Sequence, residues 1–278
     1  MTSRQPQDKM LKNFCGEGGL LMKKFFAVIL FLTLTIFAGC GSDDKVFVIG
    51  IDDEFAPMTF RDESGELVGL DIDLAKETAK RMGVKFKFKS IDWDAKETEM
   101  TSGNVDMIWS ACDIVDEYKS YMIFSKPYMN NRQIILTRKD NTATTRSEKD
   151  LAGKKVGTQS GSISDTDIKE LPELQKTFAV FRTYRSFKDS FTALDNGEID
   201  FLIVDEIAGR YALKKSGDTL KLIDVTIGRT SEFGIGFRKD DTELRDRIQK
   251  IFGEMVTDGT AKKISQKWFQ ADLINFKP

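Results

Sequence analysis

The stretch GLDIDLAKETAKRMGVKFKFKS, residues 69–90, decides the fold class. Its first part places apolar residues from Leu74 to Met82 on one helical face, and Gly83 ends that helix. Its second part alternates phenylalanine with lysine, which is the period of a half-exposed strand. The preceding run VFVIGI, residues 46–51, is typical of a strand covered on both faces. The order strand, helix, strand therefore predicts an α/β protein with a mostly parallel sheet.

Two extended segments divide the chain. RQIILTRKD at residues 132–140 and EFGIGFRKD at residues 232–240 both end in RKD, and they are suited to carry the chain to a second α/β lobe and back. The segment after the second RKD reads as two amphipathic helices that return to the first lobe. We therefore expect one lobe from residues 46–133 with 234–278, and another from residues 134–233.

The N-terminal region carries an export signal. An apolar run at residues 25–39 follows two lysines and ends at Cys40; it is shorter than the roughly 20 residues that cross a bilayer, but it fits a signal peptide. The segment FAGC resembles the lipobox of bacterial lipoproteins, with phenylalanine in place of the usual leucine. The resemblance implies a palmitate-carrying lipoprotein anchored to the cell membrane through Cys40, facing the periplasm or the cell exterior. Because Met22 fits a start, we interpret residues 1–39 as an over-long start plus signal peptide, and residues 40–45 as a tether.

Composition excludes several kinds of chemistry. The 278 residues contain no histidine and three cysteines, of which Cys15 and Cys40 lie in the N-terminal region and Cys112 stands alone. A zinc site, a Ser-His-Asp triad and a Cys-His pair are therefore excluded as far as this chain supplies the groups. The net charge is only −2, with basic and acidic residues mixed along the chain, so a nucleic-acid partner is not expected. We expect neither a metal nor a cofactor.

Seven stretches of the chain follow one another in the order of a known family. They are VIGIDDEFAPMTFRDESGELVGLDIDLAKETAKRMGVKF, SGNVDMIW, FSKPY, DLAGKKVGTQSGS, ALDNGEIDFLIVDE, GIGFRKDDTELRDRI and DGTAKKISQKWF. Through them the chain resembles the cluster-3 (polar amino acid) solute-binding proteins of ABC importers, which have the type II periplasmic binding protein fold.

The resemblance implies two lobes, each a mostly parallel sheet flanked by helices, joined by two crossover strands and closing on a small molecule. It further implies a monomeric binding protein rather than an enzyme, with an ABC permease and ATPase subunits as partners. The alternatives are a non-transporting ligand sensor, or a dehydratase or lytic enzyme on the same fold.

The resemblance assigns ligand contacts to residues near strand ends, where open α/β sheets bind ligands. Asp52 and Phe55 follow the first strand and would contact the ligand's side chain, with Trp93 on the opposite wall. Asp205 ends the run DFLIV and would bind an α-ammonium group, unless it only caps the next helix. The alternatives are that Phe55 belongs to the core, that Asp52 turns the loop, and that Trp93 is packing.

The turn GTQSGS opens onto a helix, so its backbone amides suit an anion. The resemblance assigns Gln159 to the pocket lining and Ser162 to the ligand's carboxylate, and an ordinary capped helix start is the alternative. The same resemblance places Ser110 and Ala111 at two small polar positions after the strand that follows VD.

The departure from the family pattern lies next to these positions. Asp113 stands where relatives have Thr or Ser, and Tyr118 stands where they have the arginine that grips the α-carboxylate. We therefore predict a cleft that prefers a basic amino acid or a related amine, with any carboxylate held by the amides of residues 160–162. Three alternatives stay open: Asp113 turns outward, Arg132 replaces the lost arginine, or the ligand is an ordinary polar amino acid.

Overall fold

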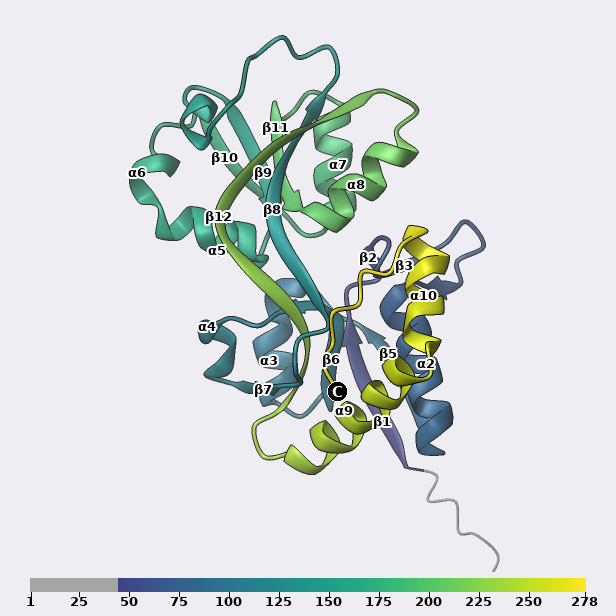
Figure 1. Ribbon diagram of the computed structural model, residues 1–278. Coiled ribbons are helices and arrows are strands. Elements are labelled where there is room, and N and C mark those ends of the chain that lie inside the picture. Colours follow the sequence, from purple (N-terminus) through teal and green to yellow (C-terminus); the bar gives the residue numbers. More distant parts are fainter. Residues whose placement is uncertain (1–44) are drawn as a thin grey trace, which may run out of the picture. The chain divides into compact units, whose positions relative to one another are not determined.

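The computed structural model describes residues 45–278 (Figure 1). The predictions for the start, the signal peptide and Cys40 lie outside the described residues. The described part contains a nine-stranded mixed sheet in the order β10-β9-β11-β8-β12-β6-β1-β5, with β7 (Met122–Phe124) paired to β12, and a three-stranded sheet β2-β3-β4. No helix in this part is long and apolar enough to cross a membrane.

The stretch that decided the fold class forms the predicted unit. Strand β1 (Val46–Ile51) pairs in parallel with β5 (Lys85–Ser90) and β6 (Met107–Asp113). Helix α2 (Leu70–Met82) buries its apolar face and ends at Gly83, which has the left-handed conformation that glycine adopts without strain. We call the half of the fold that contains these three strands the first lobe.

A second parallel unit is built in the same way and forms the second lobe. Strand β9 (Lys155–Gln159) lies between β10 (Val180–Tyr184) and β11 (Phe201–Asp205), and both pairings are parallel. Its helices are α5 (Ile163–Glu170), α6 (Pro172–Gln175), α7 (Phe187–Asp195) and α8 (Glu206–Lys215).

Two long antiparallel strands, β8 (Met129–Arg138) and β12 (Leu220–Arg238), join the lobes. Strand β8 pairs with β11 of the second lobe, and β12 pairs with β6 of the first (Figure 1). The predicted crossover strands are confirmed, but β12 begins earlier than expected. The reason is that its pairing with β8 continues through two register shifts, after Ile223 and after Ile227, instead of ending in a loop.

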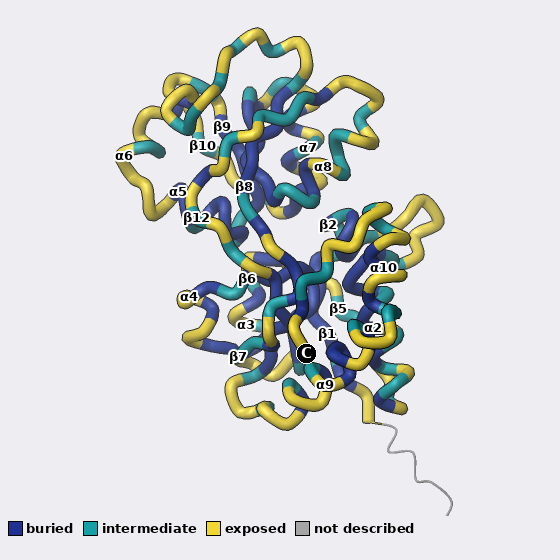
Figure 2. The backbone as a smooth tube through the Cα atoms, in the orientation of Figure 1, coloured by how far each residue is buried: buried dark blue, intermediate teal, exposed yellow. Residues whose placement is uncertain are grey.

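The two predicted C-terminal helices are present as α9 (Thr242–Thr257) and α10 (Thr260–Phe269), and both pack beside α2 (Figure 1). Buried residues follow the central strands of both lobes, whereas the edge strands β5 and β10 and the helix α6 have none (Figure 2). The remaining elements are short: β2 (Glu54–Phe55), β3 (Thr59–Arg61), β4 (Leu67–Val68), η1 (Trp93–Ala95), α3 (Lys96–Thr101), α4 (Asp116–Lys119) and η2 (Glu148–Leu151).

Candidate ligand-binding site

A small cavity, of about 10 Å³, lies where strand ends of the two lobes meet. The structure brings nine of the ten predicted site residues together around it, and Tyr118 is the one that does not line it. Ile163 and Phe187 complete the lining. The nine predicted residues are Asp52, Phe55, Trp93, Ser110, Ala111, Asp113, Gln159, Ser162 and Asp205.

Asp52 lies directly after β1 and contacts both lobes. One carboxylate oxygen accepts the backbone N–H of Glu54 at 2.9 Å, and the other accepts the side-chain amide of Gln159, on β9, at 2.6 Å. The backbone N–H of Asp52 donates to the Ser110 hydroxyl at 3.1 Å. Burial raises the pKa of Asp52 to about 6, although the hydrogen bond from Gln159 opposes this shift. Asp52 is therefore a desolvated carboxylate, and a cationic partner would stabilise its charged form.

Asp113 and Asp205 share one amide group. The side-chain nitrogen of Asn131 donates to Asp113 at 2.9 Å and also to Asp205. Gln133 donates to Asp205 at 2.8 Å, and the Ser231 hydroxyl donates to Asp113. All three donors lie on the crossover strands β8 and β12, so the strands that join the lobes also position both carboxylates.

The two carboxylates are costly to ionise together. Burial raises the pKa of both, and the negative charge of Asp205 raises the pKa of Asp113 further. Asp113 is 5% exposed, so it does not turn outward. Asp205 precedes α8 but its side chain makes no cap hydrogen bond, so its carboxylate is not a helix cap. The arrangement is suited to a cation that bonds both groups and removes their repulsion.

Aromatic side chains form the apolar walls. The rings of Phe55 and Phe187 stack with centroids 5.4 Å apart and an interplanar angle of 29°. Trp93 lies in η1 and is 7% exposed. Because Phe55 and Trp93 both line the cavity, a flat or cationic group bound there would contact aromatic side chains.

The turn at residues 160–162 differs from its prediction. The backbone N–H groups of Ser160, Gly161 and Ser162 donate to the Tyr184 carbonyl, the Asp165 carboxylate and the Gln159 carbonyl, respectively. The Ser162 hydroxyl accepts the N–H of Asp165 as the cap of α5. The expectation that these three amides hold a carboxylate is therefore wrong for this conformation, because each already has an acceptor inside the protein.

The two residues considered for the missing arginine lie elsewhere. Arg132 pairs with Glu206 at 2.6 Å and with Asp224 at 2.6 Å, and it does not line the cavity. Tyr118 is buried beside the cavity and donates its hydroxyl to the Gly161 carbonyl at 3.2 Å. Arg132 therefore does not replace the arginine.

Sequence reasoning missed several residues of this site. Asn131 and Gln133 share one face of β8 with the buried Met129, whereas Asn130 and Arg132 between them are exposed or half-buried, and that alternation was the available signal. Asp71, on α2, accepts the backbone N–H of Ala111 at 2.7 Å and thereby positions the end of β6, where Ala111 has a φ of 45°. Burial raises the pKa of Asp71 to about 7. Lys96, also missed, is buried against Trp93 and Tyr118.

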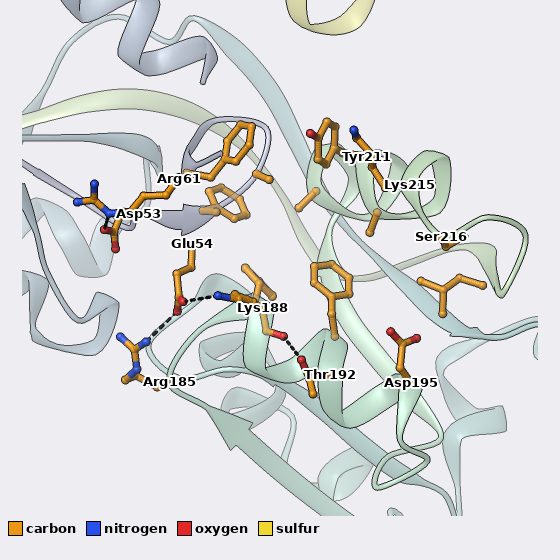
Figure 3. Close-up of a pocket in the computed structure, with 18 of the residues that line it drawn as sticks. Asp53, Glu54, Arg61, Arg185, Lys188, Thr192, Asp195, Tyr211, Lys215 and Ser216 are labelled. Atoms are coloured by element: carbon orange, nitrogen blue, oxygen red, sulfur yellow. Dashed lines mark hydrogen bonds and ion pairs between the residues drawn. The ribbon is translucent and has the colours of Figure 1, made fainter. Parts of the chain in front are cut away.

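A larger hollow, here called the rim groove, adjoins the cavity (Figure 3). It has a volume of about 700 Å³ and shares Phe55 and Phe187 with the cavity. Glu54 forms ion pairs there with Arg185 at 2.8 Å and with Lys188 at 3.3 Å, as Figure 3 shows. The side chains of both basic residues are more than half exposed, so these charges remain solvated.

The fold and the cavity define a solute-binding protein, and comparison with known proteins agrees. Residues 47–271 match the family model of bacterial extracellular solute-binding proteins, family 3, and the chain belongs to this family. It is similar to the L-cystine-binding protein TcyJ of Escherichia coli K12, with 30% identity over 93% of this chain and 97% of that protein. The arginine-binding extracellular protein ArtP of Bacillus subtilis is 30% identical, over 90% of this chain and all of that protein.

A solved structure shows the same fold. The substrate-binding protein of an ABC uptake transporter from Streptococcus pneumoniae, with bound histidine, superposes with a TM-score of 0.79. The two sequences are 34% identical, and the alignment covers 84% of this chain and 96% of that chain. The two-lobed α/β architecture and the family expected from the sequence are confirmed.

Proposed function

We propose that this protein is the substrate-binding component of an ABC importer and that it binds a basic amino acid or a related amine in the cavity. The observation that carries the proposal is the pair of buried carboxylates, Asp113 and Asp205, which share the amide of Asn131. The similar proteins named for cystine, arginine and histidine support an amino-acid ligand.

The cavity has two places for positive charge. An α-ammonium group bonds Asp205 and Asp113 and displaces the side chain of Asn131, which leaves each buried carboxylate with a charged donor. A second cationic group of the ligand lies between Phe55 and Trp93, with Asp52 as its counter-charge. Each desolvated aromatic contact adds about 0.5–2 kcal/mol to cation binding.

Binding is coupled to lobe closure. We retain residues 46–133 with 234–278 as one lobe and residues 134–233 as the other, with the hinge in β8 and β12. The hydrogen bond from Gln159 to Asp52 joins the lobes, so the structure supports a closed conformation. A ligand that contacts both lobes shifts the population toward this form, and an open form lets it leave toward a permease.

The remaining features of the proposal concern the cellular context. The protein is exported, is held on the membrane by a lipid on Cys40, and acts as a monomer with an ABC permease and ATPase subunits. We propose no catalytic role, because the chain has no histidine and its one cysteine in the described part, Cys112, is buried in a site where burial raises its pKa.

A thermal-shift screen tests the ligand class. It compares arginine, lysine, histidine, polyamines and quaternary amines with glutamate and glutamine. A ligand at 100 times its dissociation constant stabilises the folded state by about 2.7 kcal/mol, which is several degrees for a protein of this size. The proposal predicts stabilisation by at least one basic amino acid or amine. Stabilisation by glutamate or glutamine and by none of the cations contradicts it.

A further inference from the structure

Lys96 places a buried ammonium group beside the cavity. The residue is 5% exposed and lies at the start of α3. Its Nζ donates to the carbonyl of Gly161 at 2.7 Å and to that of Trp93 at 3.3 Å. It also lies 4.5 Å from the ring centroid of Tyr118 and 5.3 Å from that of Trp93. Two carbonyl groups and two aromatic rings therefore surround the charge.

This ammonium group has spare bonding capacity. A lysine ammonium has three N–H donors, and two of them are used by Gly161 and Trp93. Among residues 45–278, Lys96 forms no ion pair with a carboxylate within 4.0 Å, although the carboxylates of Asp94, Asp113 and Asp165 lie near enough to act on its charge. Burial lowers the pKa of Lys96, and these negative charges oppose that shift. A bound anion would supply both the missing acceptor and the missing charge.

Lys96 is not itself a lining residue of the cavity, but the groups that it contacts lie at the lining. Trp93 lines the cavity, and Gly161 lies between the lining residues Gln159 and Ser162. By the family resemblance of the sequence, Tyr118, whose ring contacts the ammonium, stands at the position of a carboxylate-binding arginine. The positive charge that is lost at position 118 is thus restored 4.5 Å from the ring at that position.

We propose that Lys96 binds the carboxylate of the ligand and takes the role of the missing arginine. The ligand is then an amino acid with a free carboxylate, and not a simple amine. The inference rests on the proposed function, since it requires that the ammonium end of the ligand is bound by Asp113 and Asp205. In this arrangement the third N–H of Lys96 donates to the carboxylate, while Gly161 and Trp93 hold the ammonium in place.

A competing role for Lys96 is to hold the two lobes together as a latch. The bond from Lys96 to Gly161 joins the two lobes, and a Cβ on Gly161 would lie only 2.7 Å from the Cα of Asp94, so the two segments approach closely. A latch stabilises the closed form whatever ligand is inside. A carboxylate-binding residue, by contrast, favours only ligands that carry a carboxylate, and this difference can be measured.

The test uses pairs of compounds that differ only in the carboxylate: L-arginine and agmatine, L-lysine and cadaverine, L-histidine and histamine. Isothermal titration calorimetry measures the affinity of the purified protein for both members of each pair. The wild type is expected to bind the amino acid of at least one pair about tenfold or more tightly than its amine. In Lys96→Met this preference falls to less than about threefold, with amine affinity little changed, whereas Lys96→Arg keeps it.

Two further variants separate the possible outcomes. Lys96→Met with Tyr118→Arg returns a cation to the same place and is expected to restore the preference. Asp205→Asn is expected to lower the affinity for both compounds of a pair, because it removes a bond to the ammonium group that the two compounds share. Thermal unfolding of each variant without ligand shows that it is folded.

If the wild type binds an amino acid and its amine with equal affinity, Lys96 does not bind the carboxylate, and the proposed function is not affected. This comparison needs no variant. If Lys96→Met loses affinity equally for the amino acid and the amine, Lys96 does not bind the carboxylate and acts as a latch instead. Absence of binding by every amino acid and amine overturns the proposed function, and this inference with it.

Discussion

The cavity and the rim groove both contain charged residues from the two lobes, and they share Phe55 and Phe187, yet they differ in how those charges are solvated. The groove is far larger, about 700 against 10 Å³, but its basic residues Arg185 and Lys188 remain more than half exposed. In the cavity, Asp52, Asp113 and Asp205 are at most 6% exposed, and burial raises the pKa of each. An exposed ion pair contributes about 0–1 kcal/mol, whereas a buried charged hydrogen bond contributes several times more. Desolvated charge therefore marks the ligand site better than volume does.

The largest expected effect is in the cavity. Asp205→Asn should weaken binding of a basic amino acid by about 2–5 kcal/mol, because it removes one partner of a buried charged hydrogen bond. Calorimetry against wild type measures the loss. Since the substitution keeps the shape of the side chain, a thermal unfolding temperature close to that of wild type serves as the fold control. A loss smaller than about tenfold would remove Asp205 from the ammonium site.

A smaller effect is expected from pH. The pKa of Asp52 in the ligand-free protein is raised to about 6, and a cationic ligand binds its ionised form. Below pH 6 the ligand must displace a proton from Asp52, and Asp113, whose pKa is raised to about 7, must also lose its proton to bind the ammonium group. Affinity should therefore begin to fall near pH 7, and it should fall by about tenfold or more per pH unit below pH 6. Titrations with arginine suit this test because its own charges do not change between pH 5 and 8.

Asp52→Asn is the control for the pH dependence. It should bind more weakly at pH 7.5 and show a shallower fall in affinity toward pH 5, with Asp113 and Asp205 responsible for what remains of the slope. An affinity that stays constant from pH 7.5 to pH 5 in the wild type would mean that Asp52 does not face the cation.

The smallest effect is expected in the rim groove. Glu54→Gln breaks the ion pairs with Arg185 and Lys188 and keeps the backbone N–H that supports Asp52. The affinity should change by less than about 1 kcal/mol, since solvated pairs contribute little. A loss as large as that of Asp205→Asn would show that the rim groove takes part in binding and would break the contrast between the two regions.

The fold could be predicted from sequence because its periodicity is local. The segment 69–90 shows its helix and strand without any distant contact, and both were confirmed. The start of β12 could not be predicted from a local pattern, since residues 220–227 join the strand only through their pairing with β8. Strand pairing of this kind depends on residues about 90 positions apart along the chain.

Of the residues at the ligand-binding site, some could be predicted from the sequence and others could not. Residues at strand ends, such as Asp52 and Asp205, could be placed because the topology brings strand ends together. The role of Lys96 could not be predicted, because it is one of many lysines in its region. It becomes buried only when the turn at Gly161 packs against η1. The prediction for the amides of residues 160–162 failed for a related reason: their acceptors, such as the Tyr184 carbonyl, come from elsewhere in the fold.

Mass spectrometry of the small molecule that co-purifies with the protein and is released by mild denaturation tests the central claim most directly. The account predicts a compound with at least one ammonium or guanidinium group beyond what balances its carboxylates, because three buried carboxylates line the cavity and one buried ammonium, that of Lys96, lies next to its lining. The released compound should bind again to the wild-type protein and bind weakly to Asp205→Asn. Recovery of an acidic compound, or of a neutral compound without any amine, that binds again with equal affinity to both proteins would contradict the account.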